Sequence, residues 1–201
     1  MIHSVYGNIL ASVDLECTGT WPNYHEPIQI AVVPLNNNLE PLSVTPFYRR
    51  IRAMRPDRAD SRALAVHGLY DIESGPEPEE VQDAFVDWVS KLGLPMERSL
   101  APLAHNWPFE CGFLKAWLGV PLMEKLFFGH PRDSMQLALQ LNDRAVTAGR
   151  PIPFEKVGLG DLCKRFGIVN EKAHDALSDC IAEAKVYRHL LLYQEETPPL
   201  V

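Results

Sequence analysis

The sequence predicts a mixed α/β fold, in which a β-sheet made of a three-strand antiparallel meander and additional parallel strands is flanked by helices. Three observations support this prediction. Strand-like segments come first along the chain, and three consecutive asparagines at 36–38 favour a turn between two of them. Segments with helical spacing then alternate with a further short apolar segment. The 17 prolines, well above the average usage of about 5%, divide the chain into short elements.

The individual elements follow from local patterns. Residues 8–14 (NILASVD) predict a strand ending in a carboxylate, and residues 28–35 and 43–51 predict the next two strands. Residues 99–105 (SLAPLAH) are short and apolar enough for a buried strand. Apolar residues three and four positions apart predict a helix over 78–92. Further helices are expected at 108–118, which has proline at its first position, and at 134–146, 159–166 and 173–193.

Length and composition are those of an ordinary globular protein. A chain of 201 residues can bury its own core, so we expect one domain with a core over about 8–193 and a loose tail at 194–201. No apolar run approaches the roughly 18 residues of a membrane span, and the first residues do not resemble a secretory signal. We therefore expect no membrane association and a cytoplasmic location. The four cysteines lie far apart, without a C-x-x-C pair, and indicate neither a zinc site nor a disulfide framework.

The charge balance bears on nucleic acid binding. Lys and Arg number 19 against 26 Asp and Glu, which gives a formal net charge of −7. This balance argues against a general basic surface that grips nucleic acid. The one basic concentration contains Arg49, Arg50, Arg52, Arg55, Arg58 and Arg62. It either guides a phosphate backbone or is a solvated arginine-rich segment.

Two carboxylates, Asp14 and Glu16, stand two positions apart around the end of the first expected strand. Side chains alternate across a strand, so both point to the same face. Carboxylates placed side by side repel unless a cation lies between them. Alone, the pair indicates a metal site only weakly, because a solvated strand end is the ordinary explanation.

Two further clusters place ionisable side chains near helix starts. Glu110 falls in the first turn of the helix after the buried strand, where it either complements the helix dipole or brings a third carboxylate to the sheet edge. The last expected helix opens with His174 and Asp179, for which an exposed loop histidine and helix-start chemistry are the ordinary interpretations. Taken one at a time, neither cluster defines a function.

Together the three clusters resemble the motifs of the DnaQ-like (DEDDh) 3′–5′ exonucleases. Residues 14–19 (DLECTG) are similar to the family's D-x-E-T-T-G, residues 105–110 (HNWPFE) to H-N-x-x-F-D, and residues 174–179 (HDALSD) to H-x-A-x-x-D. Weaker agreement at 66–69, 132–138 and 159–163 extends the resemblance over about residues 8–193. The resemblance implies a ribonuclease H-like fold and a nuclease.

The resemblance also implies a role for each site residue. Asp14, Glu16, Glu110 and Asp179 would hold two divalent cations, Mg²⁺ or Mn²⁺, with Asp14 bridging both. His174 would be the general base that takes a proton from the attacking water, a task suited to an imidazole with an unperturbed pKa of about 6.5. Glu110 departs from the family pattern, which has Asp there, and the extra methylene predicts either a relative preference for Mn²⁺ or a loss of activity.

Substrate contacts are expected in the loops after the first motif and within the second. Gly19 has no side chain to obstruct a nucleotide, and Trp21 can stack on a base without sequence readout. For Trp21, Trp107 and Phe109 core packing is the alternative, above all for Phe109. The expected contacts are Cys17, Thr18, Gly19, Thr20, Trp21, His105, Asn106, Trp107 and Phe109.

The sequence thus favours a metal-dependent 3′–5′ exonuclease acting on single-stranded DNA or RNA 3′ ends. The alternative is a catalytically weak relative that binds nucleic acid ends or a partner protein. The presence of His174 with the carboxylates argues against it, because a binding module needs no base. The choice between DNA and RNA, a polymerase or repair partner and the oligomeric state stay open.

Overall fold

The computed structural model describes residues 4–5, 7–94 and 98–194, and a mixed β-sheet forms its centre. The strand order is β4-β3-β2-β5-β6, and β1 pairs with the beginning of β2. Strands β2, β3 and β4 are antiparallel, whereas β5 and β6 run parallel to β2, so the predicted mixed sheet is confirmed. The strands are β1 Ser4–Val5, β2 Asn8–Cys17, β3 Pro27–Pro34, β4 Phe47–Arg50, β5 Leu100–Ala104 and β6 Arg132–Asp133.

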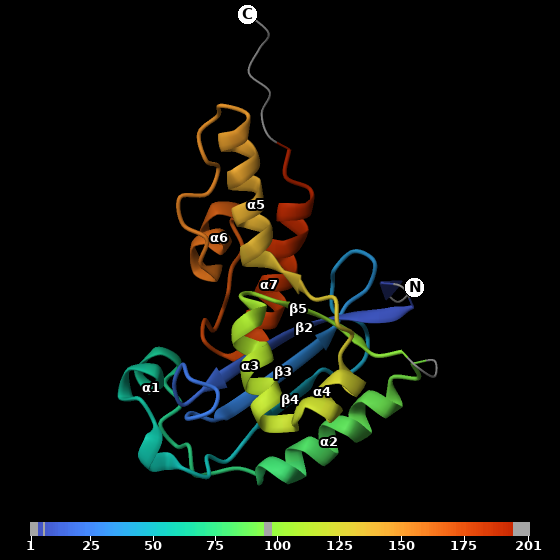
Figure 1. Cartoon of the computed structure of the whole chain (residues 1–201), viewed down its shortest axis with the longest axis vertical. Coiled ribbons are helices and arrows are strands. Elements are labelled where there is room, and N and C mark those ends of the chain that lie inside the picture. Colours follow the sequence, from blue (N-terminus) through green and yellow to red (C-terminus); the bar gives the residue numbers. More distant parts are fainter. Residues whose placement is uncertain (1–3, 6, 95–97, 195–201) are drawn as a thin grey trace, which may run out of the picture.

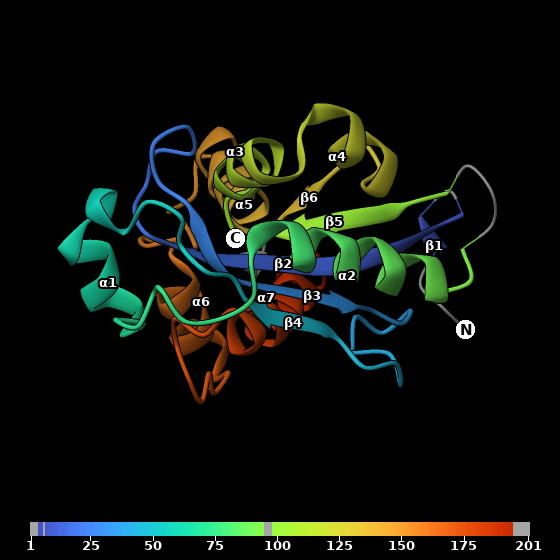
Figure 2. The same ribbon diagram turned by 90° about the horizontal axis from the view of Figure 1, so that it is seen from below.

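Helices cover both faces of the sheet (Figures 1 and 2). On one face lie α2 (Pro78–Lys91), α3 (Trp107–Leu118) and α4 (Val120–Leu126). The other face packs against α7 (Ala176–Leu191), and α5 (Ser134–Thr147) and α6 (Leu159–Phe166) pack in turn on α7. A 3-10 helix (Pro56–Arg58) and α1 (Ser61–His67) lie beyond the end of β2 (Figure 2).

The alternation of β2 decides where its carboxylates point. Ile9, Val13, Leu15 and other odd-numbered residues pack into the core under α2 and α3. Even-numbered residues such as Leu10 and Ser12 face α7 instead. Asp14 and Glu16 are even-numbered, so the strand turns them toward the helix that carries Asp179.

Several element boundaries differ from the sequence prediction. Strand β2 continues to Cys17, three residues past the predicted end, because Leu15 and Glu16 still pair with β3. Strand β4 is shorter than predicted, and the predicted helix over 173–193 begins only at 176. His174 has a φ of 65°, which an α-helix does not allow, and the Asp175 side chain then caps the helix by accepting from the Ser178 N–H.

The sequence patterns missed the shortest elements. Helices α1 and α4 have seven residues each, and β1 and β6 have two. No helix in the described part of the chain has the length and apolar character needed to cross a membrane. Of the predicted loose tail, residues 195–201 lie outside the described residues.

Candidate active site

Asp14, Glu16 and Asp179 converge where the end of β2 meets the first turn of α7. One carboxylate oxygen from each residue lies within 4.8 Å of the others. The ion pairs within residues 4–5, 7–94 and 98–194 involve other carboxylates, so no described Lys or Arg forms an ion pair with this cluster. Two of the sequence-predicted motifs therefore meet at one point.

Burial is the largest cause that raises the pKa of each of the three carboxyl groups, and repulsion from neighbouring carboxylates adds to it. Burial is the largest cause for Asp14, and repulsion from Glu16 and Asp179 adds to it. The pKa of Glu16 rises from 4.5 to about 8, again first through burial and then through Asp179 and Asp175. Carboxylates with pKa values raised in this way are stabilised in their charged form by a nearby cation.

Hydrogen bonds orient the third carboxylate, Asp179. Asn170 Nδ2 donates to Oδ1, and the backbone N–H of His174 donates to Oδ2 at 3.0 Å. Both contacts favour the ionised form, yet burial outweighs them and raises the pKa of Asp179. The same contact with Oδ2 holds the turn that carries His174 against the start of α7.

His174 lies in that turn, and its exposed side chain lines the same cavity as the carboxylates. Its left-handed backbone, at φ 65°, is one that non-glycine residues seldom adopt, and such geometry concentrates at functional sites. The turn therefore brings an imidazole to the carboxylates without extending the helix.

Glu110 reaches the cavity from the opposite layer of the molecule. Strand β5 is parallel to β2 and ends at Ala104, so the start of α3 lies beside the last part of β2. The Glu110 side chain is 4% exposed, and its Oε2 has no hydrogen-bond partner among the described residues. Burial, followed by repulsion from Asp14, raises its pKa well above the ordinary value. Glu110 thus lines the carboxylate cavity but stands outside the group of three.

The cavity has a volume of about 270 Å³, and its walls come from β2, the loop after it, α1, α3 and the turn before α7. Helix α1 contributes Ala63, Val66 and His67, which were not among the predicted site residues although the segment 66–69 resembled a family motif. His67 Nδ1 accepts the N–H of Leu69, so Nε2 carries the proton and donates to the Cys17 carbonyl. Burial lowers the pKa of His67, consistent with this neutral form.

The predicted substrate contacts divide into two groups. Gly19, Thr20 and Phe109 line the cavity, and so does Cys17, although its thiol packs into the core under α3. Thr18 is buried, and its Oγ1 accepts a hydrogen bond from the backbone N–H of Glu26. This bond joins the two ends of the loop between β2 and β3. Trp21, His105, Asn106 and Trp107 do not line the cavity.

The last three of these residues have contacts of their own. His105 Nδ1 lies 2.7 Å from Ser134 Oγ, and the Trp107 ring packs near Phe127 in the core. Asn106 sits at the start of α3 with a φ of 83°. These contacts support the helix that delivers Glu110.

A buried carboxyl that the sequence patterns missed, Glu183, lies one turn beyond Asp179 on α7 and is 1% exposed. Ser12, two residues before Asp14, donates to Glu183 Oε2 at 2.8 Å and to the Cys180 carbonyl at 3.0 Å. One hydroxyl proton cannot satisfy both acceptors fully, and a protonated Glu183 supplies the second proton. Burial raises the pKa of Glu183 well above its ordinary value, which favours that form.

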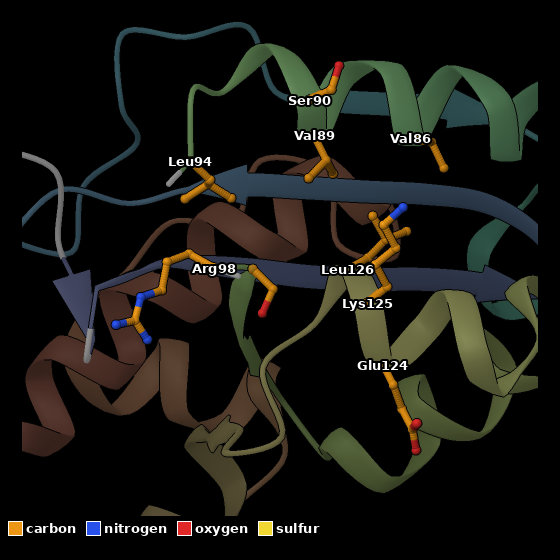
Figure 3. Close-up of a pocket in the computed structure, with 9 residues that line it drawn as sticks. Val86, Val89, Ser90, Leu94, Arg98, Glu124, Lys125 and Leu126 are labelled. Carbon is orange, nitrogen blue, oxygen red and sulfur yellow. The ribbon is translucent and has the colours of Figure 1, made fainter. Parts of the chain in front are cut away.

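A larger cavity lies away from this cluster, between α2 and α4. It has a volume of about 510 Å³ and contains no cluster of carboxylates (Figure 3). Val86 and Val89 of α2, Leu126 of α4 and Leu94 form its apolar part. Size alone therefore does not identify the active site, whereas convergent ionisable groups do.

The smaller cavity has the groups that phosphodiester hydrolysis requires. Carboxylate oxygens are the ligands of hard divalent cations, and a histidine beside them can accept a proton at neutral pH. The edge of the sheet, flanked by helices, presents the carboxylates and the histidine to the same opening. Fold and side chains together define a nuclease.

Comparison with known proteins agrees with this class. The family model described as "Exonuclease" (RNase_T) matches residues 12–187. The chain belongs to this exonuclease family, consistent with the resemblance to DnaQ-like (DEDDh) enzymes. A comparison with curated protein sequences gives no match.

Solved structures share the fold. The zinc-bound complex of Escherichia coli exonuclease I with single-stranded DNA is similar at a TM-score of 0.68 and 16% identity, and exonuclease I from Methylocaldum szegediense at 0.70 and 22%. Each alignment covers 93% of this chain, which spans only 41% of either enzyme. The nuclease domain of 3′hExo, a DEDDh family member bound to rAMP, is similar at 0.68 and 17%, covering 94% of both chains.

Proposed function

We propose that the protein is a divalent-metal-dependent 3′–5′ exonuclease that removes nucleotides from the 3′ ends of single-stranded DNA or RNA. The convergence of Asp14, Glu16 and Asp179 within 4.8 Å, in one cavity with His174, carries the proposal. The solved structures with this fold support it, since they include exonuclease I with single-stranded DNA and the 3′hExo nuclease domain with rAMP.

The residues fit hard cations. The donor set is all oxygen, no described Lys or Arg forms an ion pair with it, and a buried oxygen of Glu110 has no partner. Asp14, Glu16, Asp179 and Glu110 would therefore hold the metal. When bound, two Mg²⁺ or Mn²⁺ ions would lower the pKa of the attacking water and neutralise charge on the phosphate.

The protein's own residues then have distinct tasks. His174 accepts the proton of the attacking water, and the turn that carries it is fixed through its N–H to Asp179 Oδ2. Gly19, Thr20 and Phe109 form the wall against which the terminal nucleotide rests. The chain acts as one exonuclease domain over about residues 8–193, a span that contains the matched residues 12–187.

The test uses a 5′-labelled linear single strand of DNA or RNA, a duplex and a circular single-stranded DNA. Each is incubated with the protein in Mg²⁺, Mn²⁺ or EDTA, with Asp14→Asn as the matched inactive variant. We expect a ladder of products shortened from the 3′ end of linear strands, in metal only. Cleavage of the circle would show an endonuclease. Binding without cleavage in either metal would favour the weakly catalytic relative instead.

A further inference from the structure

Two large aromatic side chains are exposed beside the active-site cavity. Trp21 is 69% and Tyr24 46% exposed, and both belong to the turn that follows Thr20 in the cavity wall. Single exposed apolar residues are common on protein surfaces, but adjacent exposed aromatics at the rim of a cavity indicate a binding surface. Their neighbours show what this surface can hold.

Hydrogen bonds hold the turn from Trp21 to His25 together. The backbone N–H groups of Tyr24 and His25 donate to the Trp21 carbonyl, and the Trp21 N–H donates to His25 Nδ1. The rings of Trp21 and Tyr24 meet edge to face at 6.5 Å between centroids. A Cβ on Gly19 would lie 2.4 Å from the His25 ring, so glycine lets the turn fold back on the cavity wall. An aromatic surface held in place before binding loses little entropy when it binds.

Arg58 adds a positive charge to the same surface. Its guanidinium lies 5.0 Å from the centroid of the Tyr24 ring, and it forms no ion pair with another described residue. Arg52 and Arg55, by contrast, are paired with Glu77 and Glu26. A stacked guanidinium with free hydrogen-bond donors suits a phosphate next to a stacked base.

The volume of the cavity shows why an outer surface is needed. At about 270 Å³ it falls below the ~300–1,000 Å³ of sites that enclose a drug-sized ligand, so it is too small to enclose a segment longer than one nucleotide. The strand upstream of that nucleotide must leave across the rim. A net charge of −7 argues against a general basic surface that would hold the strand there.

We infer that Trp21, Tyr24 and Arg58 form a nucleobase platform, which binds the single-stranded segment immediately 5′ of the terminal nucleotide by stacking on a base and pairing with its phosphate. The inference rests on the proposed exonuclease function and adds a second, sequence-independent contact to it. Stacking on aromatic residues changes affinity by roughly ten- to a hundredfold per base.

Two substrates separate the platform from the chemistry. A single-stranded 12-mer reaches the platform, whereas the p-nitrophenyl ester of thymidine 5′-monophosphate has the scissile bond and no upstream nucleotide. The measured quantity is kcat/KM on the 12-mer divided by kcat/KM on the ester. We expect Trp21→Ala to lower this ratio at least tenfold, because KM for the 12-mer rises. Trp21→Phe should restore the ratio to within threefold, and Arg58→Ala should lower it and weaken its salt dependence. Val146→Ala, at an exposed site on α5, is the control.

Equal losses on both substrates would overturn the inference, because the turn would then only support the cavity wall. An unchanged ratio in Trp21→Ala would also overturn it. Failure of the wild type to cleave either substrate contradicts the proposed function instead. Even then, the platform can be tested by measuring the binding of a labelled 12-mer through its fluorescence anisotropy. We expect Trp21→Ala to bind the 12-mer at least fivefold more weakly than the wild type. Equal affinities would overturn the inference.

Discussion

The hydroxyl of Tyr48 donates a 2.5 Å hydrogen bond to Asp175 Oδ2, which joins strand β4 to the residue that caps α7. Gln29 on β3 extends the link, because its side chain donates to the Tyr48 oxygen and accepts the N–H of Ala176. Burial, and then the bond to Asp175, raises the pKa of Tyr48 to about 12, so the hydroxyl remains a donor. The sheet thereby holds the turn that contains His174.

Tyr48→Phe should therefore lower kcat several-fold while changing KM little. The phenyl ring keeps the packing but leaves Asp175 without this donor, and a hydrogen bond to a charged group contributes about 1.5–3 kcal/mol. Urea denaturation should show a loss of this size, about 1.5–3 kcal/mol, in the free energy of unfolding. Tyr70→Phe, at an exposed tyrosine, is the control. Unchanged kcat in Tyr48→Phe would separate this network from catalysis.

His174→Ala should reduce the cleavage rate by roughly 10²–10⁴, the usual contribution of a general base. His174 is exposed and outside any helix, so the variant should fold and bind metal as the wild type does. The measurement is kcat at saturating metal, with thermal unfolding in EDTA as the check on folding. Turnover equal to the wild type would remove His174 from the mechanism.

The metal-free protein should become less stable as the pH rises from about 6.5 to 8. Glu16 has a pKa of about 8 when folded and about 4.5 when unfolded, so above 4.5 the folded state binds more protons. The stabilising contribution of Glu16 is fully present below the unfolded-state pKa of 4.5. It is lost as the pH rises through the folded-state pKa of about 8. The pKa values of Asp14 and Glu110 are also raised by burial, so these two groups change the stability in the same direction.

Urea denaturation in EDTA should show this loss as about 1 kcal/mol or more over that range. Saturating Mg²⁺ should flatten the dependence, because a cation stabilises the ionised carboxylates. Asp14→Asn should raise the stability of the metal-free protein by relieving repulsion. A free energy of unfolding that rises with pH in EDTA would contradict the proposed repulsion.

Glu183→Gln should change the free energy of unfolding at pH 7 by less than about 1 kcal/mol, because a neutral amide replaces a neutral carboxyl of similar shape. Glu183→Ala should cost about 2–3 kcal/mol by leaving a cavity and removing one of the two hydrogen bonds of the Ser12 hydroxyl. Denaturation of both variants in EDTA makes the comparison. If Glu183→Gln is as unstable as Glu183→Ala, the buried carboxyl is ionised in the folded protein.

Sequence patterns predicted the parts of the fold that depend on local chemistry. The alternation of β2 was sufficient to place Asp14 and Glu16 on one face, and the resemblance brought Glu110, His174 and Asp179 to the same site. The end of β2 was wrong because it depends on pairing with β3, which the local pattern does not contain. The start of α7 was wrong because Tyr48 and Gln29, on distant strands, hold Asp175 and Ala176 directly after the left-handed backbone of His174.

The remaining features depend on tertiary structure. His67 lines the cavity because α1 folds against the end of β2, and a seven-residue helix has too few turns to show a clear apolar face. Glu183 has the spacing of an ordinary helix residue and becomes notable only through burial against Ser12. Trp21 was identified as aromatic and near the first motif, but its exposure and its contacts with Tyr24 required the folded turn.

Glu110 stands where the family pattern has Asp. Its Oε2 is buried without a partner, and its carboxyl lines the cavity outside the group of three, so the longer side chain reaches the site from α3. Mg²⁺ demands near-ideal octahedral geometry, whereas Mn²⁺ binds oxygen and nitrogen ligands with less rigidity. We expect the wild type to be relatively more active with Mn²⁺, and Glu110→Asp to narrow the ratio of the Mn²⁺ rate to the Mg²⁺ rate.

Glu110→Gln should lose most activity with either ion, because a neutral amide keeps the shape of the side chain and removes its charge. Initial rates of the three proteins on one single-stranded substrate, with each metal at saturation, make the test. If Glu110→Gln cleaves as fast as the wild type, Glu110 is not a ligand, and the fourth carboxylate must be sought at Asp175 or Asp133. Of these, Asp133 already accepts the backbone N–H groups of Trp107 and Gln136, and Asp175 that of Ser178, so either would have to give up a helix-start contact to bind metal. If Glu110→Asp leaves the ratio unchanged, the start of α3 has already compensated for the extra methylene.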